Sequence, residues 1–286
     1  RSGTDMALGS VILLVVNLLF MGTANAMTLR VGAASRPIGL GNPYDSISTL
    51  GSHSRANIFD GLTQQSPEGE LEPALAVSWE ATSDHTWKFK MRPGAVFSNG
   101  EPADAAAAKA TIDFLTQPES ARYLIARELR AIEITEVIDE ETLLITTKYP
   151  DAILSKRLSL VMIVPPRAFA DMGLEEFAQA PIGTGSYMLE DWGLRSGRSI
   201  LRSNESSWRE PTQINRVEIL APLRDPIVRL QALRSDQVDI TVNISVDEID
   251  EAKRDGFVID TKLSSTIQAI ALPNVGNPGS PLRDVR

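Results

Sequence analysis

The sequence predicts a fold of the α/β class, in which strands and helices alternate along the chain. Trp87, Phe89 and Met91 alternate with basic residues, which is the pattern of a strand with one buried face. The alanine-rich run 103–115 places its apolar residues on one helical stripe. Asp225 followed by Pro226 is a strong helix start. At 286 residues, the chain can fold around a core of its own.

The individual elements follow from hydrophobic periodicity and from turn residues. Strands are expected over 28–33, 133–137, 143–147, 187–192, 199–202, 217–220 and 238–240. Helices are expected over 47–62, 103–115, 121–131, 153–160 and 169–177, and from residue 225 onward. Between residues 62 and 102, turns rich in proline and glycine separate short hairpin strands.

The composition argues against several classes of site. The sequence contains no cysteine, so it forms neither a disulfide nor a thiolate zinc site. The net charge of -9 argues against nucleic acid as a partner, because phosphate binding needs clustered Lys and Arg. Of the two histidines, His85 is interpreted as a surface residue of a turn, and His53 is disfavoured as a metal ligand. We therefore expect no catalytic residue, no metal site and no cofactor.

The sequence lacks the motifs of two enzyme classes, the serine hydrolases and the P-loop nucleotide-binding proteins. No G-x-S-x-G elbow accompanies either histidine, which argues against a serine hydrolase. The loop Gly183-Thr184-Gly185 lacks the Lys-Ser/Thr of a phosphate-binding P-loop. Its glycines are expected to allow tight passage of the backbone instead.

The N-terminal residues are typical of an export signal. An apolar run over 11–21 is followed by Ala24-Asn25-Ala26, which fits an A-x-A cleavage site. The run is too short to cross a bilayer of ~30 Å, which needs about 20 residues. We therefore expect residues 1–26 to be a cleaved signal peptide and the mature protein to be periplasmic, with an uncleaved anchor as the alternative.

A series of motifs resembles the family 5 extracellular solute-binding proteins, the peptide and nickel receptors of bacterial ABC importers. The matching segments, in the family's order, are 59–62 (FDGL), 73–79 (PALAVSW), 87–102, 181–187 (PIGTGSY), the pair Asn204 and Trp208, and 230–240. Each motif alone is weak, but the collinear set is specific. It covers essentially all of the chain after the predicted signal peptide.

The resemblance implies a periplasmic-binding-protein-like fold of type II. Its first lobe would have a core made of 27–50 and 180–272, with an inserted α/β subdomain over 51–179. Residues 273–286 would cross the hinge and start a second lobe that is otherwise missing from this sequence.

The resemblance also implies a function. The protein would be a monomeric periplasmic receptor that traps a small solute between two lobes and delivers it to a membrane permease, without catalysis. An oligopeptide or dipeptide is the first expectation. A nickel chelate is the alternative, because 97–102 and 180–185 resemble the nickel receptors, although the arginine that these place ahead of the Pro-Pro element is absent here. A secreted hydrolase and a solute sensor are alternatives of another class.

The ligand-facing segment that the resemblance implies is the Gly/Pro loop 36–46. A loop with free backbone groups can hydrogen-bond an extended ligand, and an arginine fork can hold a carboxylate. The predicted ligand contacts are Leu40, Gly41, Asn42, Tyr44, Asp45, Ser46, Arg122 and Tyr123. The alternative for Arg122 is a solvated arginine on a helix. The sequence leaves open whether the solute is a peptide, a nickel chelate, an opine or a sugar.

Overall fold

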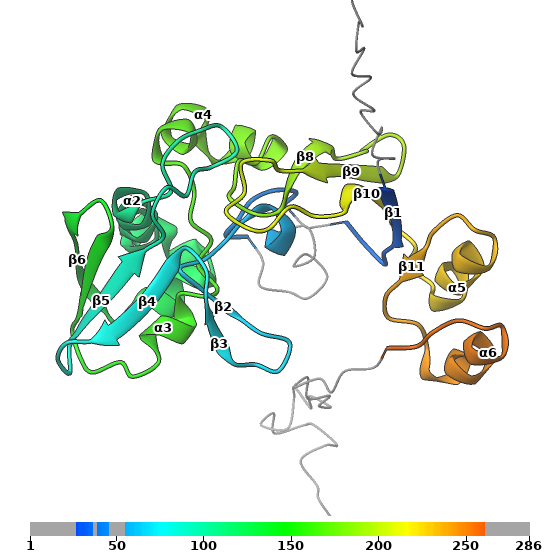
Figure 1. Cartoon of the computed structure of the whole chain (residues 1–286), viewed down its shortest axis with the longest axis horizontal. Helices are drawn as coiled ribbons and strands as arrows, with labels where there is room; N and C mark the ends of the chain where they lie inside the picture. Colours follow the sequence, from blue (N-terminus) through cyan, green and yellow to red (C-terminus); the bar gives the residue numbers. More distant parts are fainter. Residues whose placement is uncertain (1–26, 37–38, 46–54, 261–286) are drawn as a thin grey trace, which may run out of the picture. The chain divides into compact units, whose positions relative to one another are not determined.

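The computed structural model describes residues 27–36, 39–45 and 55–260 (Figure 1). The predicted signal peptide 1–26, the predicted hinge segment 273–286, Ser46 and His53 lie outside the described residues. The described residues up to Asn243 form one compact unit, and those from Ile244 onward form another.

A five-stranded mixed sheet joins two distant parts of the chain. Its strands are β1 (Met27–Gly32), β8 (Tyr187–Asp191), β9 (Arg198–Ser203), β10 (Ile214–Leu220) and β11 (Ile240–Thr241). The order is β11-β1-β10-β9-β8, with β1 parallel to both of its neighbours and the other pairs antiparallel. In Figure 1 the dark blue β1 accordingly lies beside the yellow β10.

The strands between β1 and β8 belong to other sheets. One is antiparallel, with the order β4-β5-β7-β6, and the other pairs β2 with β3. Their bounds are β2 (Thr63–Gln65), β3 (Leu71–Pro73), β4 (Ala76–Ala81), β5 (Thr86–Met91), β6 (Ile132–Asp139) and β7 (Thr142–Thr147). Phe89 and Met91 of β5 are fully buried, as their alternation with basic residues predicts. The boundaries predicted for the inserted subdomain stay predictions.

Helix α5 (Pro226–Arg234) begins where the sequence predicts, and α2 (Ala105–Thr116) begins two residues after its predicted start. The Asp104 carboxylate accepts from the Ala107 amide, and the Asp225 carboxylate accepts from the Ile227 amide, so both helices have a side-chain cap. Contacts between elements place α2 against β6 and β7.

Helix α4 (Pro166–Gln179) is interrupted. Gly173 has φ 68 and ψ 168, which are not helical angles, so two short helices meet there. The first of them is capped from a distant segment, because the Glu101 carboxylate accepts from the amides of Arg167 and Ala168, each at 3.0 Å.

Three predicted helices are shorter than expected. In the described part of the first, predicted over 47–62, only residues 55–58 are helical. The predicted helix 121–131 is instead two 3₁₀ turns, η1 (Pro118–Arg122) and η2 (Ile125–Leu129). Tyr123 between them has an extended backbone, and its ring packs against the core, so tertiary packing overrides the local preference for helix. Of the predicted helix 153–160, only α3 (Leu154–Arg157) forms. The chain turns after it so that the Ile163 amide can donate to the Asp60 carbonyl.

The second unit contains η3 (Val246–Glu248) and α6 (Ile249–Arg254). A capping box between Ser245 and Glu248 starts it.

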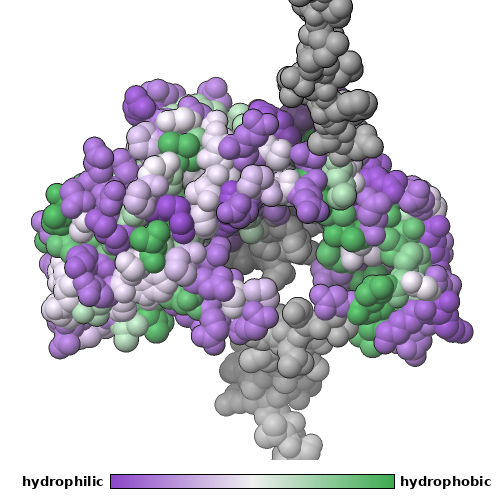
Figure 2. Space-filling view, viewed as in Figure 1, coloured by the Kyte–Doolittle hydropathy of each residue, from purple (hydrophilic) through white to green (hydrophobic). Residues whose placement is uncertain are grey.

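The surface is largely hydrophilic on the face that Figure 2 shows. Apolar residues gather most in the region of β11 and α5, where Ile227 and Val228 are exposed. Among the helices in the described part of the chain, none combines the length and the apolar character that a membrane span requires.

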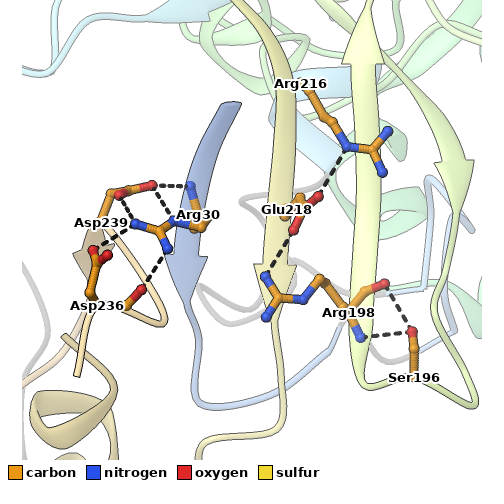
Figure 3. A network of polar contacts seen from close by, with 7 residues as sticks. All are labelled: Arg30, Ser196, Arg198, Arg216, Glu218, Asp236 and Asp239. Atoms are coloured by element: carbon orange, nitrogen blue, oxygen red, sulfur yellow. Dashed lines mark hydrogen bonds and ion pairs between the residues drawn. The ribbon is translucent and has the colours of Figure 1, made fainter. Parts of the chain in front are cut away.

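Ion pairs tie the strands of the five-stranded sheet together (Figure 3). On β1, the Arg30 guanidinium lies 2.6 Å from the Asp239 carboxylate and 2.8 Å from that of Asp236. On β10, the Glu218 carboxylate accepts from Arg216 at 3.0 Å and from Arg198 at 2.8 Å. The hydrogen bonds from Arg216 and then Arg198 hold the pKa of Glu218 below its usual range, and the bond from Arg30 does the same for the pKa of Asp239.

Candidate binding pocket

An open pocket of about 930 Å³ lies where the loop 39–45, the turn between η1 and η2, and helix α4 meet. Five of the eight predicted contacts line it, and they come from two segments that are far apart in the sequence: Leu40, Asn42, Asp45, Arg122 and Tyr123. Its volume falls within the range of about 300–1,000 Å³ that is typical of small-ligand sites. The structure therefore assembles most of the predicted set around one hollow, while contact with a solute stays a prediction.

The loop is held in shape by local hydrogen bonds and by left-handed backbone angles. Gly39 and Leu40 have φ of 70 and 55. The Asn42 amide donates to the Gly39 carbonyl at 3.0 Å, and the Asn42 side-chain oxygen accepts from the Tyr44 amide at 2.9 Å. This tight turn exposes the side chains of Leu40, Asn42 and Asp45 at the pocket.

Gly41 contributes to anchoring and does not line the pocket. Its amide donates to the Ala178 carbonyl at 2.9 Å, which fixes the loop to the end of α4. A Cβ atom at this position would lie 2.6 Å from the Pro181 side chain and 2.8 Å from the Ala178 oxygen. Only glycine fits at such a close approach.

The structure does not place Tyr44 among the residues that line the pocket. Its side chain is 1 % exposed and packs in the core against the rings of Phe114, Tyr123 and Phe169, with centroid distances of 5.7, 6.1 and 6.0 Å. The prediction that Tyr44 faces the ligand is therefore wrong for its side chain, because a large aromatic ring gains more from burial than from solvent. Tyr44 supports the loop and Tyr123 from inside.

The Tyr44 hydroxyl is an unsatisfied buried group. It approaches Thr111 without reaching hydrogen-bond geometry, and no other described residue accepts from it. The Thr111 hydroxyl already accepts from the Val164 amide at 3.2 Å. Burial raises the pKa of the Tyr44 hydroxyl well above its usual value.

We predict that Tyr44→Phe leaves the protein as stable as before or raises the free energy of unfolding by up to about 1 kcal/mol, because it removes an unsatisfied polar atom. Tyr187→Phe is the matched control. The Tyr187 hydroxyl bonds to the Thr212 hydroxyl and the Ile214 carbonyl, each at 3.0 Å, so its loss should cost about 1 kcal/mol. Urea denaturation of both variants measures the difference. A larger loss in Tyr44→Phe than in Tyr187→Phe would contradict this account of the cluster.

The pocket presents charges of both signs. Arg122 is exposed, its guanidinium donates to the Tyr123 hydroxyl at 2.7 Å, and it lies 4.9 Å from the centroid of that ring. Asp45 and Glu175 line the same hollow and are also exposed. Within the described ranges, the three groups make no ion pair with one another or with other side chains. One cation and two anions therefore remain available to a ligand.

Half of the pocket was not anticipated from the sequence. Helix α4 contributes Met172, Gly173, Leu174, Glu175, Ala178 and Gln179. The only signal in the sequence is Gly173 inside an otherwise helical pattern, which marks a break but not its orientation.

Of the two histidines, only His85 lies within the described residues, and the search for a metal site is likewise limited to them. His85 is exposed in its turn, with Nδ1 2.9 Å from the Thr147 carbonyl, as its interpretation as a surface residue requires. Within residues 27–36, 39–45 and 55–260, no group of three or more Asp, Glu, His or Cys side chains is arranged to hold a metal ion.

A second polar cluster surrounds the buried Asp60 carboxylate. The Asp60 side chain is 3 % exposed and accepts from the Arg209 guanidinium at 2.6 and 2.8 Å. It also accepts from the Trp208 indole at 3.0 Å and from the Thr184 hydroxyl at 2.8 Å. The guanidinium of Arg92 lies 4.0 Å from the Trp208 ring centroid. These residues belong to the motifs that the sequence shares with a family, and the structure gives them a role in holding segments together.

The glycines of 183–185 have a similar role. A Cβ atom on Gly183 would lie 1.9 Å from the Ile58 carbonyl oxygen, and one on Gly185 would lie 2.3 Å from that of Asn57. The Gly185 amide donates to the Ile58 carbonyl at 2.9 Å. The tight backbone passage predicted for this loop is thus confirmed.

Comparison with known proteins gives consistent results. Residues 70–286 match the family model described as bacterial extracellular solute-binding proteins, family 5 middle. Protein XP55 of Streptomyces lividans is 29% identical over 265 residues, which are 89% of this chain and 46% of that protein. The glutathione-binding protein GsiB of Escherichia coli K12 is 30% identical over 197 residues, which are 67% of this chain and 36% of GsiB.

Solved structures agree with the fold. AgaA of A. tumefaciens R10, in complex with agropinic acid, superposes with a TM-score of 0.73 at 25% identity, covering 79% of this chain and 46% of AgaA. OppA of Burkholderia pseudomallei superposes with a TM-score of 0.71 at 20% identity, covering 81% of this chain and 49% of OppA. The chain spans about half the length of the solved proteins that it matches, and the predicted mixed α/β fold is confirmed.

Proposed function

Because the chain belongs to the bacterial extracellular solute-binding proteins of family 5, we propose that its open pocket is one wall of the solute site in an ABC importer receptor. The family binds solutes and is not enzymatic, which agrees with the expectation that the chain has no catalytic role. The receptor as a whole would be a monomeric periplasmic protein of two lobes that hands its solute to a membrane permease.

The proposal for the solute rests on the charged side chains of the pocket. Arg122 can hold a carboxylate through a charge-assisted hydrogen bond, and Asp45 and Glu175 can hold an ammonium group. A solute with both groups, such as a short peptide, fits this arrangement. The name of GsiB supports it, because glutathione is itself a tripeptide with a free ammonium and free carboxylates.

The motifs behind the nickel-chelate alternative lie outside the pocket lining. The segments 97–102 and 180–185 that suggested it pack on each other, since the Ser98 amide donates to the Gly183 carbonyl at 2.9 Å. None of these residues lines the pocket. A peptide therefore stays the first proposal, and nickel chelates and opines are comparison ligands in its test.

Solute binding would close the two lobes, because contacts with both are made only in the closed state. A micromolar solute corresponds to about 8 kcal/mol of binding free energy, and the loss of half of it weakens binding on the order of a thousandfold. This chain alone should thus bind its solute only weakly.

The test uses the full-length protein encoded by the gene. A thermal-shift screen with dipeptides, tripeptides, glutathione, nickel-histidine, opines and sugars should give its largest shift with a peptide. Calorimetry with that peptide should then show affinity falling about 10- to 100-fold in Arg122→Gln, since a hydrogen bond to a charged group contributes about 1.5–3 kcal/mol. Asp45→Asn should weaken binding in the same direction.

Arg127→Gln is the control, because Arg127 is exposed in the neighbouring η2 turn and does not line the pocket. It should leave the affinity unchanged. A sugar as the best ligand, or equal affinity in wild type and Arg122→Gln, would contradict the proposal.

A further inference from the structure

A second, apolar cavity of about 470 Å³ lies between helices α2 and α4. Ala110 and Phe114 of α2 face Phe169 and Ala170 of α4 across it. The two phenyl rings meet edge to face, with centroids 5.2 Å apart, and both are only partly buried. Apolar surface that is open to water in a concave site is available for a ligand to cover.

The apolar cavity adjoins the charged pocket. Arg122, Gly173 and Leu174 line both of them. The helix break at Gly173 lies on this boundary, and the space next to its Cα is open, with no atom within 4 Å of the position a Cβ would take. The carboxylate-binding side chain of the first pocket therefore stands at the entrance of the second.

We propose that the apolar cavity selects the side chain next to the solute's carboxylate, so that the receptor prefers peptides ending in a branched or aromatic residue. This inference rests on the proposed function, because it assumes that Arg122 holds the carboxylate. In a peptide, the C-terminal side chain and the carboxylate share one Cα atom. A carboxylate on Arg122 thus places that side chain at the mouth of the cavity.

The residues that line the apolar cavity suit an apolar side chain of the solute. Among the described residues that line the cavity, Arg122 is the only charged one, and it lies at the shared boundary. The hydroxyl of Thr111, the other polar side chain in the lining, belongs to a residue that is 1 % exposed, and it accepts from the Val164 amide. The other side chains of the lining are apolar, so a polar side chain would exchange many contacts with water for few partners, whereas an apolar one gains by leaving water.

The cavity exists because two facing positions carry alanine. Ala110 is half-buried, and Ala170 is exposed along the face of α4. A leucine at either position would occupy the space without replacing a large core side chain. Ala106 on the same helix α2 is exposed and does not line the cavity, so it offers a matched control.

The experiment compares Ala-Gly, Ala-Leu and Ala-Phe by calorimetry with the full-length protein encoded by the gene. We expect Ala-Leu or Ala-Phe to bind at least tenfold more tightly than Ala-Gly. Ala110→Leu should bring this ratio toward one, whereas Ala106→Leu should preserve it. If Ala110→Leu does not fold, Ala170→Leu fills the same cavity from the exposed helix face.

Two outcomes would overturn the inference and leave the proposed function standing. One is equal affinity for the three dipeptides together with loss of binding in Arg122→Gln. The other is a preference for apolar termini that survives both leucine variants, which would place the side chain elsewhere. If no peptide binds at all, the proposed function fails, and the inference fails with it.

Discussion

Replacing Asp60 by alanine is expected to lower the free energy of unfolding by about 3 kcal/mol, because it removes a buried carboxylate that pairs with the partly exposed Arg209 guanidinium. The Asp60 carboxylate receives four hydrogen bonds, two from Arg209, one from Trp208 and one from Thr184. Its removal would leave Trp208, Thr184 and Nη1 of Arg209 without this acceptor, whereas Nη2 of Arg209 keeps the Gln64 side-chain oxygen at 3.0 Å. Urea denaturation followed by circular dichroism measures the loss.

Asp84→Ala is the control for this variant. Asp84 is an exposed turn residue, so its loss should change stability by no more than about 0.5 kcal/mol. A second comparison, Asp60→Asn, keeps the shape and part of the hydrogen bonding and should lie between wild type and Asp60→Ala. A loss below about 1 kcal/mol in Asp60→Ala would show that the cluster does not hold these segments together.

The second large effect is expected from Gly183→Ala. Its Cβ would lie 1.9 Å from the Ile58 carbonyl oxygen and 2.7 Å from the Ile58 carbonyl carbon. Both are backbone atoms of the short helical segment 55–58, which cannot move aside like a flexible side chain. We expect a loss on the order of 3 kcal/mol or failure to fold, measured as the melting temperature and the soluble yield.

Gly100→Ala separates this steric effect from backbone strain. Gly100 has φ 85, and nothing lies within 4 Å of a Cβ built on it. The substitution should cost about 1 kcal/mol through its left-handed backbone alone. Equal losses in the two variants would indicate that close packing at Gly183 is not the reason for its glycine.

The sequence predicts much of the fold because many elements carry local signals. The alternation around Phe89 correctly predicts a strand with one buried face, and Asp225 is the N-cap of α5 as predicted. The prediction of a helix over 121–131 fails because Tyr123 has an extended backbone and packs in the core. This packing depends on residues that are far away in the sequence. No local pattern contains that information.

The motifs that reveal the family do not reveal its solute. Asp60, Gly183 and Trp208 belong to the segments that carry the resemblance, and the structure uses them to join parts of the fold. The pocket instead uses loop 39–45, the turn at Arg122 and the end of α4, which carry no such motif. Arg122 and Asp45 are predicted as ligand contacts from a loop and an arginine fork and not from a motif, and no comparable signal marks Glu175.

The burial of Tyr44 is a further feature that the sequence does not predict. Its position in the Gly/Pro loop suggested a ligand contact, but its ring is one of the most deeply buried in the described chain. Loop residues can point inward wherever an aromatic cluster offers space, and sequence periodicity does not report on this.

The most direct measurement of the central claim is hydrogen–deuterium exchange of the full-length protein with and without its best-binding peptide. We predict slower amide exchange in the bound state within residues 39–45, around Arg122 and Tyr123, and along 172–179. Amides beside Arg127, Arg130 and Lys148, which border a separate cavity, should be unchanged. Protection confined to the cavity lined by Arg127, Arg130 and Lys148, with the loop 39–45 exchanging as in the free protein, would contradict the account.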